Sequence, residues 1–195
     1  MAAIPLKIFN VKQTEAISTA TYFDFLDKEK CEKIVADFVT DKPITAMIDG
    51  DVVDPYRETL IHPIPMDEKS QWLYDDIADR VARYNQFGFD FDISGLYGDL
   101  QLLEYPVGGH YDWHIDTGPG EAAHRKLSVI IQLSDPEDYE GGEVLFKASA
   151  KEHELPKEQG KLAVFPSYIL HKVNEVTEGR RFALATWALS HRRFR

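Results

Sequence analysis

The sequence predicts a mostly β fold with flanking helices, either a sandwich or an open barrel. Up to Gly88, apolar residues recur with the period of an α-helix, and beyond it apolar runs become short, β-branched and aromatic, with turn residues between them. Short strands at regular spacing, without crossover helices between them, are typical of antiparallel sandwiches and barrels. We therefore expect an antiparallel β-core with two N-terminal helices packed on its outside.

The first part of the chain predicts two helices separated by a loop. The first helix begins after Asp27, a suitable N-cap, and ends at residues 41–43. Residues 44–65 are rich in Pro and Asp and predict a loop, and the second helix follows over 67–86 with Gly88 as its C-terminal cap. The apolar stripe of the first helix consists of Cys31, Ile34, Val35, Phe38 and Val39, and that of the second of Leu73, Ile77, Val81 and Tyr84.

The second part of the chain predicts strands only. We place them near residues 99–105, 110–114, 126–133, 143–147, 161–165, 169–176 and 180–189. A length of 195 residues falls within the range of one domain, and no linker or repeat divides it. We expect a single domain over 1–195, with a helical part over 1–90 and a β-core over 91–195.

The charge of the chain limits its partners. Lys and Arg number 22 against 33 Asp and Glu, which gives a formal net charge of −11. This balance disfavours nucleic acid and anionic lipid as partners, because both require clustered cations. No apolar run reaches the length of a membrane span, and Met1–Glu15 lacks the order of a signal peptide. The single cysteine, Cys31, is predicted to be a core residue, and we expect a cytoplasmic protein.

Histidines next to carboxylates indicate a candidate metal site. Two His and one carboxylate with open positions are the signature of non-haem Fe(II) oxygenases. Residues i and i+2 point to one side of a strand, so His-x-Asp can bind one ion. That motif is common by chance and occurs twice, at residues 110–112 and 114–116, which leaves both open at this point. The remaining histidines have no partner at such spacing and are predicted to lie on the surface, namely His62, His124, His153 and His191.

Residues 100–189 carry three blocks that resemble a known family. They are LQLLEYPVGGHYDWHID from Leu100, LSDPEDYEGGEVLF from Leu133 and FPSYILHKVNEVTEGRRFALATW from Phe165. Together they resemble the 2-oxoglutarate- and Fe(II)-dependent dioxygenases of the prolyl 4-hydroxylase type. The resemblance covers nearly half of the chain.

The resemblance implies a metal-binding and catalytic triad. In the family, the metal-binding His follows a Tyr by nine residues, and here Tyr105 selects His114 and Asp116 over His110 and Asp112. The later blocks imply His171 as the third ligand. His110 and Asp112 are then expected in a loop or facing outward.

The resemblance also implies a binding site for the cosubstrate. A basic residue about ten positions after the distal His holds the far carboxylate of 2-oxoglutarate, and a Trp follows it by six. These spacings match Arg181 and Trp187. Strand parity favours Arg181 over Arg180, because its face also carries two alanines that leave room for a diacid. Tyr105 matches a cosubstrate-contacting Tyr, and Gln132 stands where related enzymes often have a Tyr, so its contact stays open.

The implied fold and chemistry follow from this family. The fold is a double-stranded β-helix of the jelly-roll or cupin-like kind. The cofactors are Fe(II), 2-oxoglutarate as cosubstrate and O2, with ascorbate as the reductant in vitro. The reaction couples decarboxylation of 2-oxoglutarate to hydroxylation of an unactivated C–H bond. The carboxylate ligand Asp116 favours hydroxylation over halogenation, because related halogenases lack it.

The substrate is predicted less narrowly. The resemblance favours a prolyl or other residue of a protein or peptide. A free amino acid or another small molecule is the alternative, and a non-catalytic metal-binding β-barrel module is a third class. Arg57, in the loop of residues 44–65, and Trp187 are the candidate substrate contacts, together with the loop of residues 117–125. The net charge disfavours a nucleic-acid demethylase, and the oligomeric state stays open.

Overall fold

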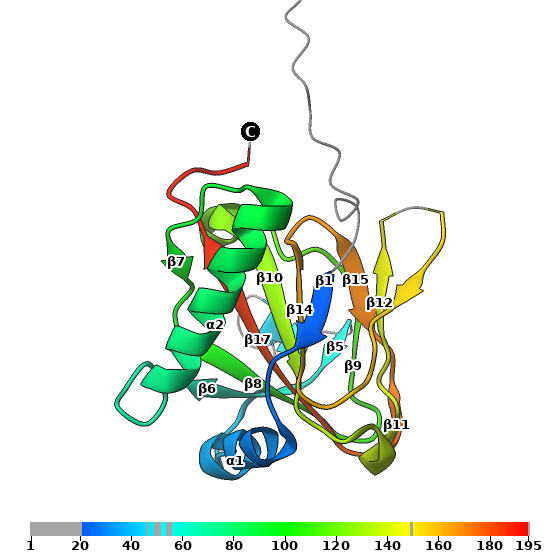
Figure 1. Cartoon of the computed structure of the whole chain (residues 1–195). Coiled ribbons are helices and arrows are strands. Elements are labelled where there is room, and N and C mark those ends of the chain that lie inside the picture. The colour runs from blue at the N-terminus through cyan, green and yellow to red at the C-terminus, as the bar shows by residue number, and fades with distance from the viewer. Residues whose placement is uncertain (1–20, 46, 49–51, 54–55, 149, 195) are drawn as a thin grey trace, which may run out of the picture.

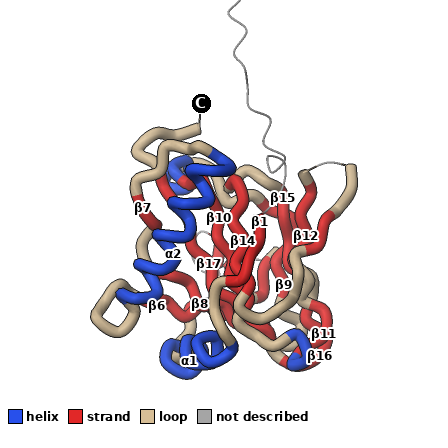
Figure 2. Tube along the Cα trace, in the orientation of Figure 1, coloured by secondary structure: helices blue, strands red, loops and turns tan. Residues whose placement is uncertain are grey.

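Two antiparallel sheets lie face to face, with two helices outside the larger one, in the computed structural model (Figures 1 and 2). The structure describes residues 21–45, 47–48, 52–53, 56–148 and 150–194. The predicted mostly β core with helices outside it is confirmed. Residues 1–20 lie outside the described part. The prediction that the first 15 residues are not a signal peptide concerns this segment.

The larger sheet forms the layer between the helices and the interior. Its strands are, in spatial order, β1 (Thr21–Asp24), β14 (Lys161–Pro166), β10 (Arg125–Gln132), β17 (Arg181–Leu189), β8 (Leu100–Tyr105), β6 (Leu60–Ile64) and β2 (Ile44–Thr45), with β7 (Gly95–Leu96) beside β17.

The smaller sheet closes the interior from the other side. Its order is β13 (His153–Glu154), β12 (Val144–Lys147), β15 (Leu170–Val173), β9 (His110–His114) and β5 (Arg57–Glu58). Two short antiparallel pairs complete the described strands, β11 (Tyr139–Gly141) with β16 (Val176–Gly179) and β3 (Met47–Ile48) with β4 (Val52–Val53).

Both predicted helices form and cover the outer face of the larger sheet (Figure 1). They are α1 (Lys28–Phe38) and α2 (Gln71–Tyr84). The Asp27 carboxylate accepts a hydrogen bond from the Lys30 amide at 2.8 Å, which confirms the predicted N-cap. Cys31 is fully buried in the helix–sheet core, as expected for a core residue. No helix of the described residues is long and apolar enough to cross a membrane.

Strand β17 shows how one sheet serves two layers. Phe182 and Leu184 pack into the core under the helices, whereas Ala185 packs between the two sheets. Arg181 shares the inner face with Ala185, as the parity argument predicted, because successive side chains of a strand point to opposite faces. The larger sheet therefore separates an apolar core under the helices from an interior between the sheets that contains polar groups.

The predicted loop over 44–65 is wrong, because most of the described residues of this segment form the short strands β2 to β6. Residues 60–64 form β6, which is hydrogen-bonded to β8 inside the larger sheet. Pro63 in this segment argued against a strand, because proline cannot donate to a ladder. The other neighbour, β2, pairs only with Leu60 and Ile61, so Pro63 lies where that side of β6 has no partner strand. The part of the chain over 1–90 is therefore not only helical.

The second helix ends differently from the prediction. After Tyr84 the chain continues in a π-helical turn, η1 (Asn85–Phe89), which includes Gly88. The left-handed residue that ends this turn is Asp90, with φ of 53°. The Asn85 side chain takes over the capping, because its amide bonds to the Phe91 backbone in both directions.

His62 is not a surface residue, contrary to the prediction. It is 1% exposed on β6, and its Nδ1 accepts a hydrogen bond from the Thr40 amide at 3.0 Å. Its Nε2 lies 2.8 Å from the Glu104 carboxylate, which also pairs with Arg180 at 3.1 Å. The sequence spacing could not show this network, because its members come from four separate segments.

The strands predicted after residue 98 are confirmed, with one change. The single strand expected over 169–176 is divided into β15 and β16, which join different sheets. The segment between them turns the chain away from the smaller sheet. This division leaves His171 in β15, beside β9.

The Asp27 cap predicts a measurable contribution to stability. Replacement of Asp27 by Ala removes the acceptor for the Lys30 amide and is expected to lower the free energy of unfolding by about 1 kcal/mol. Urea unfolding followed by circular dichroism measures this loss. Asp41→Ala, in an exposed residue just beyond α1, is the matched control and is expected to change stability by less than about 0.5 kcal/mol. Equal effects of the two substitutions would contradict the capping role.

Candidate metal and cosubstrate site

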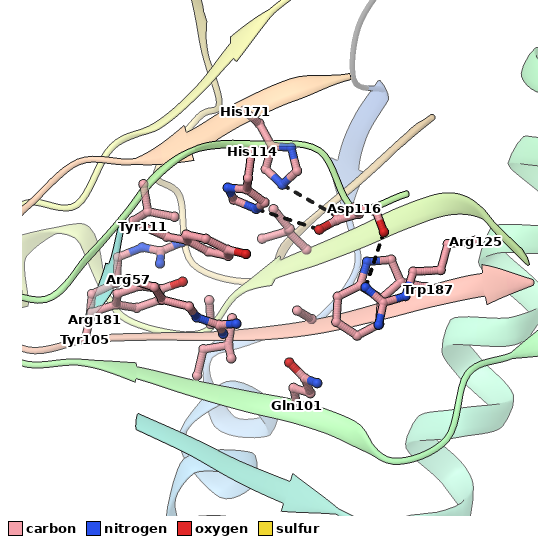
Figure 3. Close-up of a pocket in the computed structure, with 15 residues that line it drawn as sticks. Arg57, Gln101, Tyr105, Tyr111, His114, Asp116, Arg125, His171, Arg181 and Trp187 are labelled. Carbon is pink, nitrogen blue, oxygen red and sulfur yellow. Dashed lines mark hydrogen bonds and ion pairs between the residues drawn. The ribbon is translucent and has the colours of Figure 1, made fainter. Parts of the chain in front are cut away.

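A cavity of about 150 Å³ opens between the two sheets (Figure 3). The larger sheet supplies its floor from β8, β10 and β17, and β5, β9 and β15 supply its other wall. The residues that line it are Arg57, Gln101, Leu103, Tyr105, Tyr111, His114, Asp116, Arg125, Ile130, His171, Val173, Arg181, Ala183, Ala185 and Trp187. Seven of the eight predicted site residues line the cavity. The eighth, Gln132, lies behind Arg181 and accepts a hydrogen bond from it.

The structure brings the predicted triad together. His114 and His171 are directly paired across β9 and β15, and Asp116 follows two residues after β9 ends. The Asp116 carboxylate lies 3.7 Å from Nε2 of His114 and 3.6 Å from Nε2 of His171. One ligand atom from each of the three lies within 4.8 Å of the others, a distance that a single ion can bridge. Among the described residues, no other group of His, Cys, Asp and Glu meets this condition.

Backbone carbonyls set the orientation of both imidazoles. Nδ1 of His114 lies 2.7 Å from the Asp112 carbonyl, and Nδ1 of His171 lies 2.9 Å from the Ile169 carbonyl. A carbonyl only accepts, so each Nδ1 donates its proton and each Nε2 keeps a free lone pair. Both lone pairs point to the space beside Asp116, which is the arrangement that a metal ion requires.

The protonation states also suit a metal ion. Burial and the neighbouring His171 lower the pKa of His114 to about 4, so this imidazole is neutral at pH 7. Burial by itself would raise the pKa of Asp116, but the two imidazoles and the Ser128 hydroxyl outweigh it and hold that pKa below its ordinary value. The Ser128 Oγ lies 2.5 Å from Oδ2 of Asp116. The site therefore presents the Nε2 atoms of two imidazoles and one carboxylate.

Arg181 supplies the test of whether a dicarboxylic cosubstrate fits. Its side chain is 1% exposed and lies over the Tyr105 ring at 5.0 Å. Nη2 donates to the neutral Gln132 amide oxygen at 2.8 Å, whereas Nε and Nη1 have no partner among the described residues. A buried cation without an anion is costly, and the unpartnered N–H groups of Arg181 can donate to a carboxylate. The residues present therefore fit 2-oxoglutarate.

Gly142 makes room for this arginine. Its φ is +62°, and a Cβ at this position would lie 2.9 Å from Cδ of Arg181. A larger residue would be strained and would also displace the arginine stem. The glycine pair in the turn before β12 thus helps to position the guanidinium.

Three polar wall residues were not singled out from the sequence: Gln101, Tyr111 and Arg125, the last of which ends the predicted substrate loop of residues 117–125. Tyr111 stacks on the His114 ring with centroids 3.4 Å apart, although strict alternation would put positions 111 and 114 on opposite faces. The pairing of β9 with β15 is irregular between these positions, and β10 has a bulge between Arg125 and Leu127. Each irregularity changes which face a side chain occupies, and neither leaves a signal in hydrophobic periodicity.

The two candidate substrate residues also reach the cavity. The Arg57 guanidinium lies 4.6 Å above the Tyr111 ring, and the Trp187 indole carries the Arg125 guanidinium at 3.8 Å. His110 and Asp112 of the competing motif instead line a groove on another face, with Lys172 and Glu175. The geometry thus favours the second His-x-Asp motif.

Comparison with known proteins finds a family model and relatives that match part of this chain. Residues 100–189 match the model of the 2OG-Fe(II) oxygenase superfamily. A PKHD-type hydroxylase of Pseudomonas paraeruginosa is 38% identical over 92 residues, which cover 44% of this chain and 41% of that protein. Another, from Stenotrophomonas maltophilia, is 38% identical over 115 residues, or 56% of this chain and 51% of its own. The chain thus spans about half or less of the length of these relatives.

Solved structures share the fold. A Pseudomonas putida prolyl-4-hydroxylase aligns with a TM-score of 0.68 at 19% identity, over 89% of this chain and 93% of that one. A prolyl hydroxylase from Trichoplax adhaerens, in complex with a hypoxia inducible factor peptide fragment, aligns with a TM-score of 0.72 at 20% identity, over 89% and 84%. These structures show the fold of the chain, and the double-stranded β-helix expected from the resemblance is confirmed.

Ser128 is predicted to support metal binding without touching the metal. Ser128→Ala removes the hydroxyl that holds Asp116, and we expect the affinity for Mn(II) in place of Fe(II) to fall by about 10- to 100-fold. Anaerobic titration calorimetry measures the affinity. Ser94→Ala, at a hydroxyl that bonds only to the Leu189 carbonyl, is the control. An unchanged affinity in Ser128→Ala would show that the carboxylate needs no such support.

Proposed function

We propose that this protein is a 2-oxoglutarate- and Fe(II)-dependent dioxygenase that hydroxylates an unactivated C–H bond. The observation that carries the proposal is the buried guanidinium of Arg181, which has no acidic partner among the described residues and lies in the same cavity as the triad. A metal alone would not require this arginine, and an anion alone would not require the triad. A ligand that bridges metal and arginine satisfies both.

The metal triad and the residues around Arg181 have separate roles in this proposal. His114, Asp116 and His171 would hold Fe(II), and Arg181, positioned by Tyr105 and Gln132, would hold the far carboxylate of 2-oxoglutarate. When bound, iron, 2-oxoglutarate and O2 supply the oxidising chemistry, with succinate and CO2 formed beside the hydroxylated product.

The protein's own contribution is geometry, charge and exclusion of water. The fixed Nδ1–H bonds keep both imidazoles ready to bind through Nε2. Two neutral imidazoles and one carboxylate give an Fe(II) site a net charge near +1, which favours an anionic chelating ligand. Ala183 and Ala185 leave space on the cavity floor, and Leu103, Ile130 and Val173 provide apolar walls.

The proposed substrate is a prolyl or other residue of a protein or peptide. Support comes from the names of the similar proteins, which are PKHD-type hydroxylases and prolyl hydroxylases, one of them bound to a peptide. A free amino acid or another small molecule, held in the same cavity, is the second candidate. We also propose a cytoplasmic location, since the single cysteine is buried and forms no disulfide.

The third class, a structural metal module, is disfavoured by the ligand set. A closed structural site takes four protein ligands, and the described residues bring three together. Open positions on the metal are what an oxygenase needs.

The triad can be tested by turnover. With Fe(II), ascorbate, 2-oxoglutarate and O2, the purified protein is expected to form succinate, faster with one class in a panel of proline peptides and free amino acids. His171→Ala is expected to abolish this formation, because it removes one of three metal ligands. His153→Ala, at an exposed histidine far along the smaller sheet, is the control. Succinate formation retained in His171→Ala would refute the triad.

The cosubstrate site can be tested with adjacent arginines. Arg181→Gln removes the buried charge and is expected to raise the apparent KM for 2-oxoglutarate at least about tenfold, the effect of losing a charge-assisted hydrogen bond. Arg180→Gln is the matched control, because that side chain is 59% exposed and pairs with Glu104 outside the cavity. If Arg180→Gln had the larger effect, the assigned face of β17 would be wrong.

A further inference from the structure

The cavity contains more positive charge than the proposed cosubstrate uses. Three arginines line it, Arg57, Arg125 and Arg181, whereas Asp116 is the only carboxylate that the described residues place in its wall. With Fe(II) the triad carries a charge of about +1. The arginines add three positive charges and 2-oxoglutarate removes two, so two cationic groups remain beside the reacting centre.

The two remaining arginines, Arg57 and Arg125, lie on different sides of the metal-binding triad. Figure 3 shows Arg57 on the side of Tyr105 and Arg181, and Arg125 with Trp187 on the side of Asp116. A cosubstrate that extends from the triad to Arg181 leaves the Arg125 side open. The group that reaches Arg125 must therefore come from the second substrate.

Arg125 is held ready for an anion. Its guanidinium stacks on the Trp187 indole at 3.8 Å, and Nη1 donates to the Asp116 carbonyl at 3.3 Å. Its Nε is buried without a partner among the described residues. The Tyr97 ring lies 5.1 Å from this guanidinium, and the Tyr97 hydroxyl donates to the Glu121 carboxylate. Stacking fixes the plane of the fork, which reduces the entropy lost when a carboxylate binds.

Arg57 repeats the pattern on the opposite wall. Its guanidinium stacks on Tyr111 at 4.6 Å, and its Nε is also buried without a partner among the residues that the structure describes. Tyr111 in turn stacks on His114, so the Tyr111 ring separates the Arg57 guanidinium from the triad. Both arginines thus meet the second substrate with an aromatic ring behind them.

We infer that the substrate presents a carboxylate to this cavity, received chiefly by Arg125 with Arg57 as the second cation. This inference rests on the proposed function and narrows its substrate class. Because Arg125 bonds to the backbone of Asp116, the hydroxylated carbon lies within a few bonds of that carboxylate. A free amino acid and the C-terminal residue of a peptide share this chemistry, whereas an internal prolyl residue with neutral neighbours does not.

The test compares an acid with its amide on the intact complex. The protein is loaded anaerobically with Mn(II) and saturating 2-oxoglutarate and titrated with N-acetyl-L-proline or N-acetyl-L-prolinamide in a calorimeter. The acid is expected to bind at least about tenfold more tightly, since charge-assisted bonds to arginine are the stronger ones. Arg125→Gln is expected to remove most of this preference and Arg57→Gln part of it. Arg83→Gln, on the exposed face of α2, is the control.

Equal affinity for acid and amide, absence of acid binding, or a preference that survives in both cavity variants would overturn the inference. The variants' own affinity for 2-oxoglutarate, measured first, shows that each one folds. Failure of the proposed function has another signature, the lack of Mn(II)-dependent 2-oxoglutarate binding in the unaltered protein.

A second arm identifies the source of the carboxylate. Gly-Gly-L-proline, its amide and free L-proline are titrated into the same complex. Tighter binding of the tripeptide acid supports a peptide C-terminus, and tighter binding of free proline supports an amino acid. Both results support the carboxylate site, whereas tighter binding of the tripeptide amide than of either acid would contradict it.

Discussion

The pairing of β9 with β15 is the constraint on which the site depends. It places His114 directly opposite His171, and the chain that leaves β9 returns Asp116 to the same space two residues later. The Asp116 amide is then held by the Ser167 carbonyl at 2.9 Å, next to the strand that carries His171. A shift of this register by one residue would turn one imidazole to the outer face and separate the three ligands.

Charge organises the rest of the cavity around that pairing. The triad can bind a cation, and Arg181 can bind an anion. Gln132, a neutral residue, accepts a hydrogen bond from one N–H group of Arg181. A carboxylate at position 132 would neutralise the arginine from within the protein and weaken its need for a ligand. Two further cations rest on aromatic rings, so the cavity is an electrostatic site for acids more than an apolar one.

The larger sheet keeps this polar interior compatible with stability. Its helix-facing side buries an apolar core with α1 and α2. Its inner side carries Arg181 and the small residues of the cavity floor. Arg180 lies on the other face of the same strand, outside the cavity. There it pairs with Glu104, which also contacts His62. Function and packing thus use alternate residues of the same strands.

Local patterns in the sequence determined much of this architecture. Helical periodicity and a capping Asp27 placed α1, short β-branched runs placed the later strands, and parity assigned Arg181 to the interior. The family resemblance, not periodicity, selected His114, Asp116 and His171. Tertiary structure decided what depends on distant partners: the strand through Pro63, and the bulges that turn Tyr111 and Arg125 into the cavity. A bulge or an edge position is set by the neighbouring strand, so the residues themselves do not encode it locally.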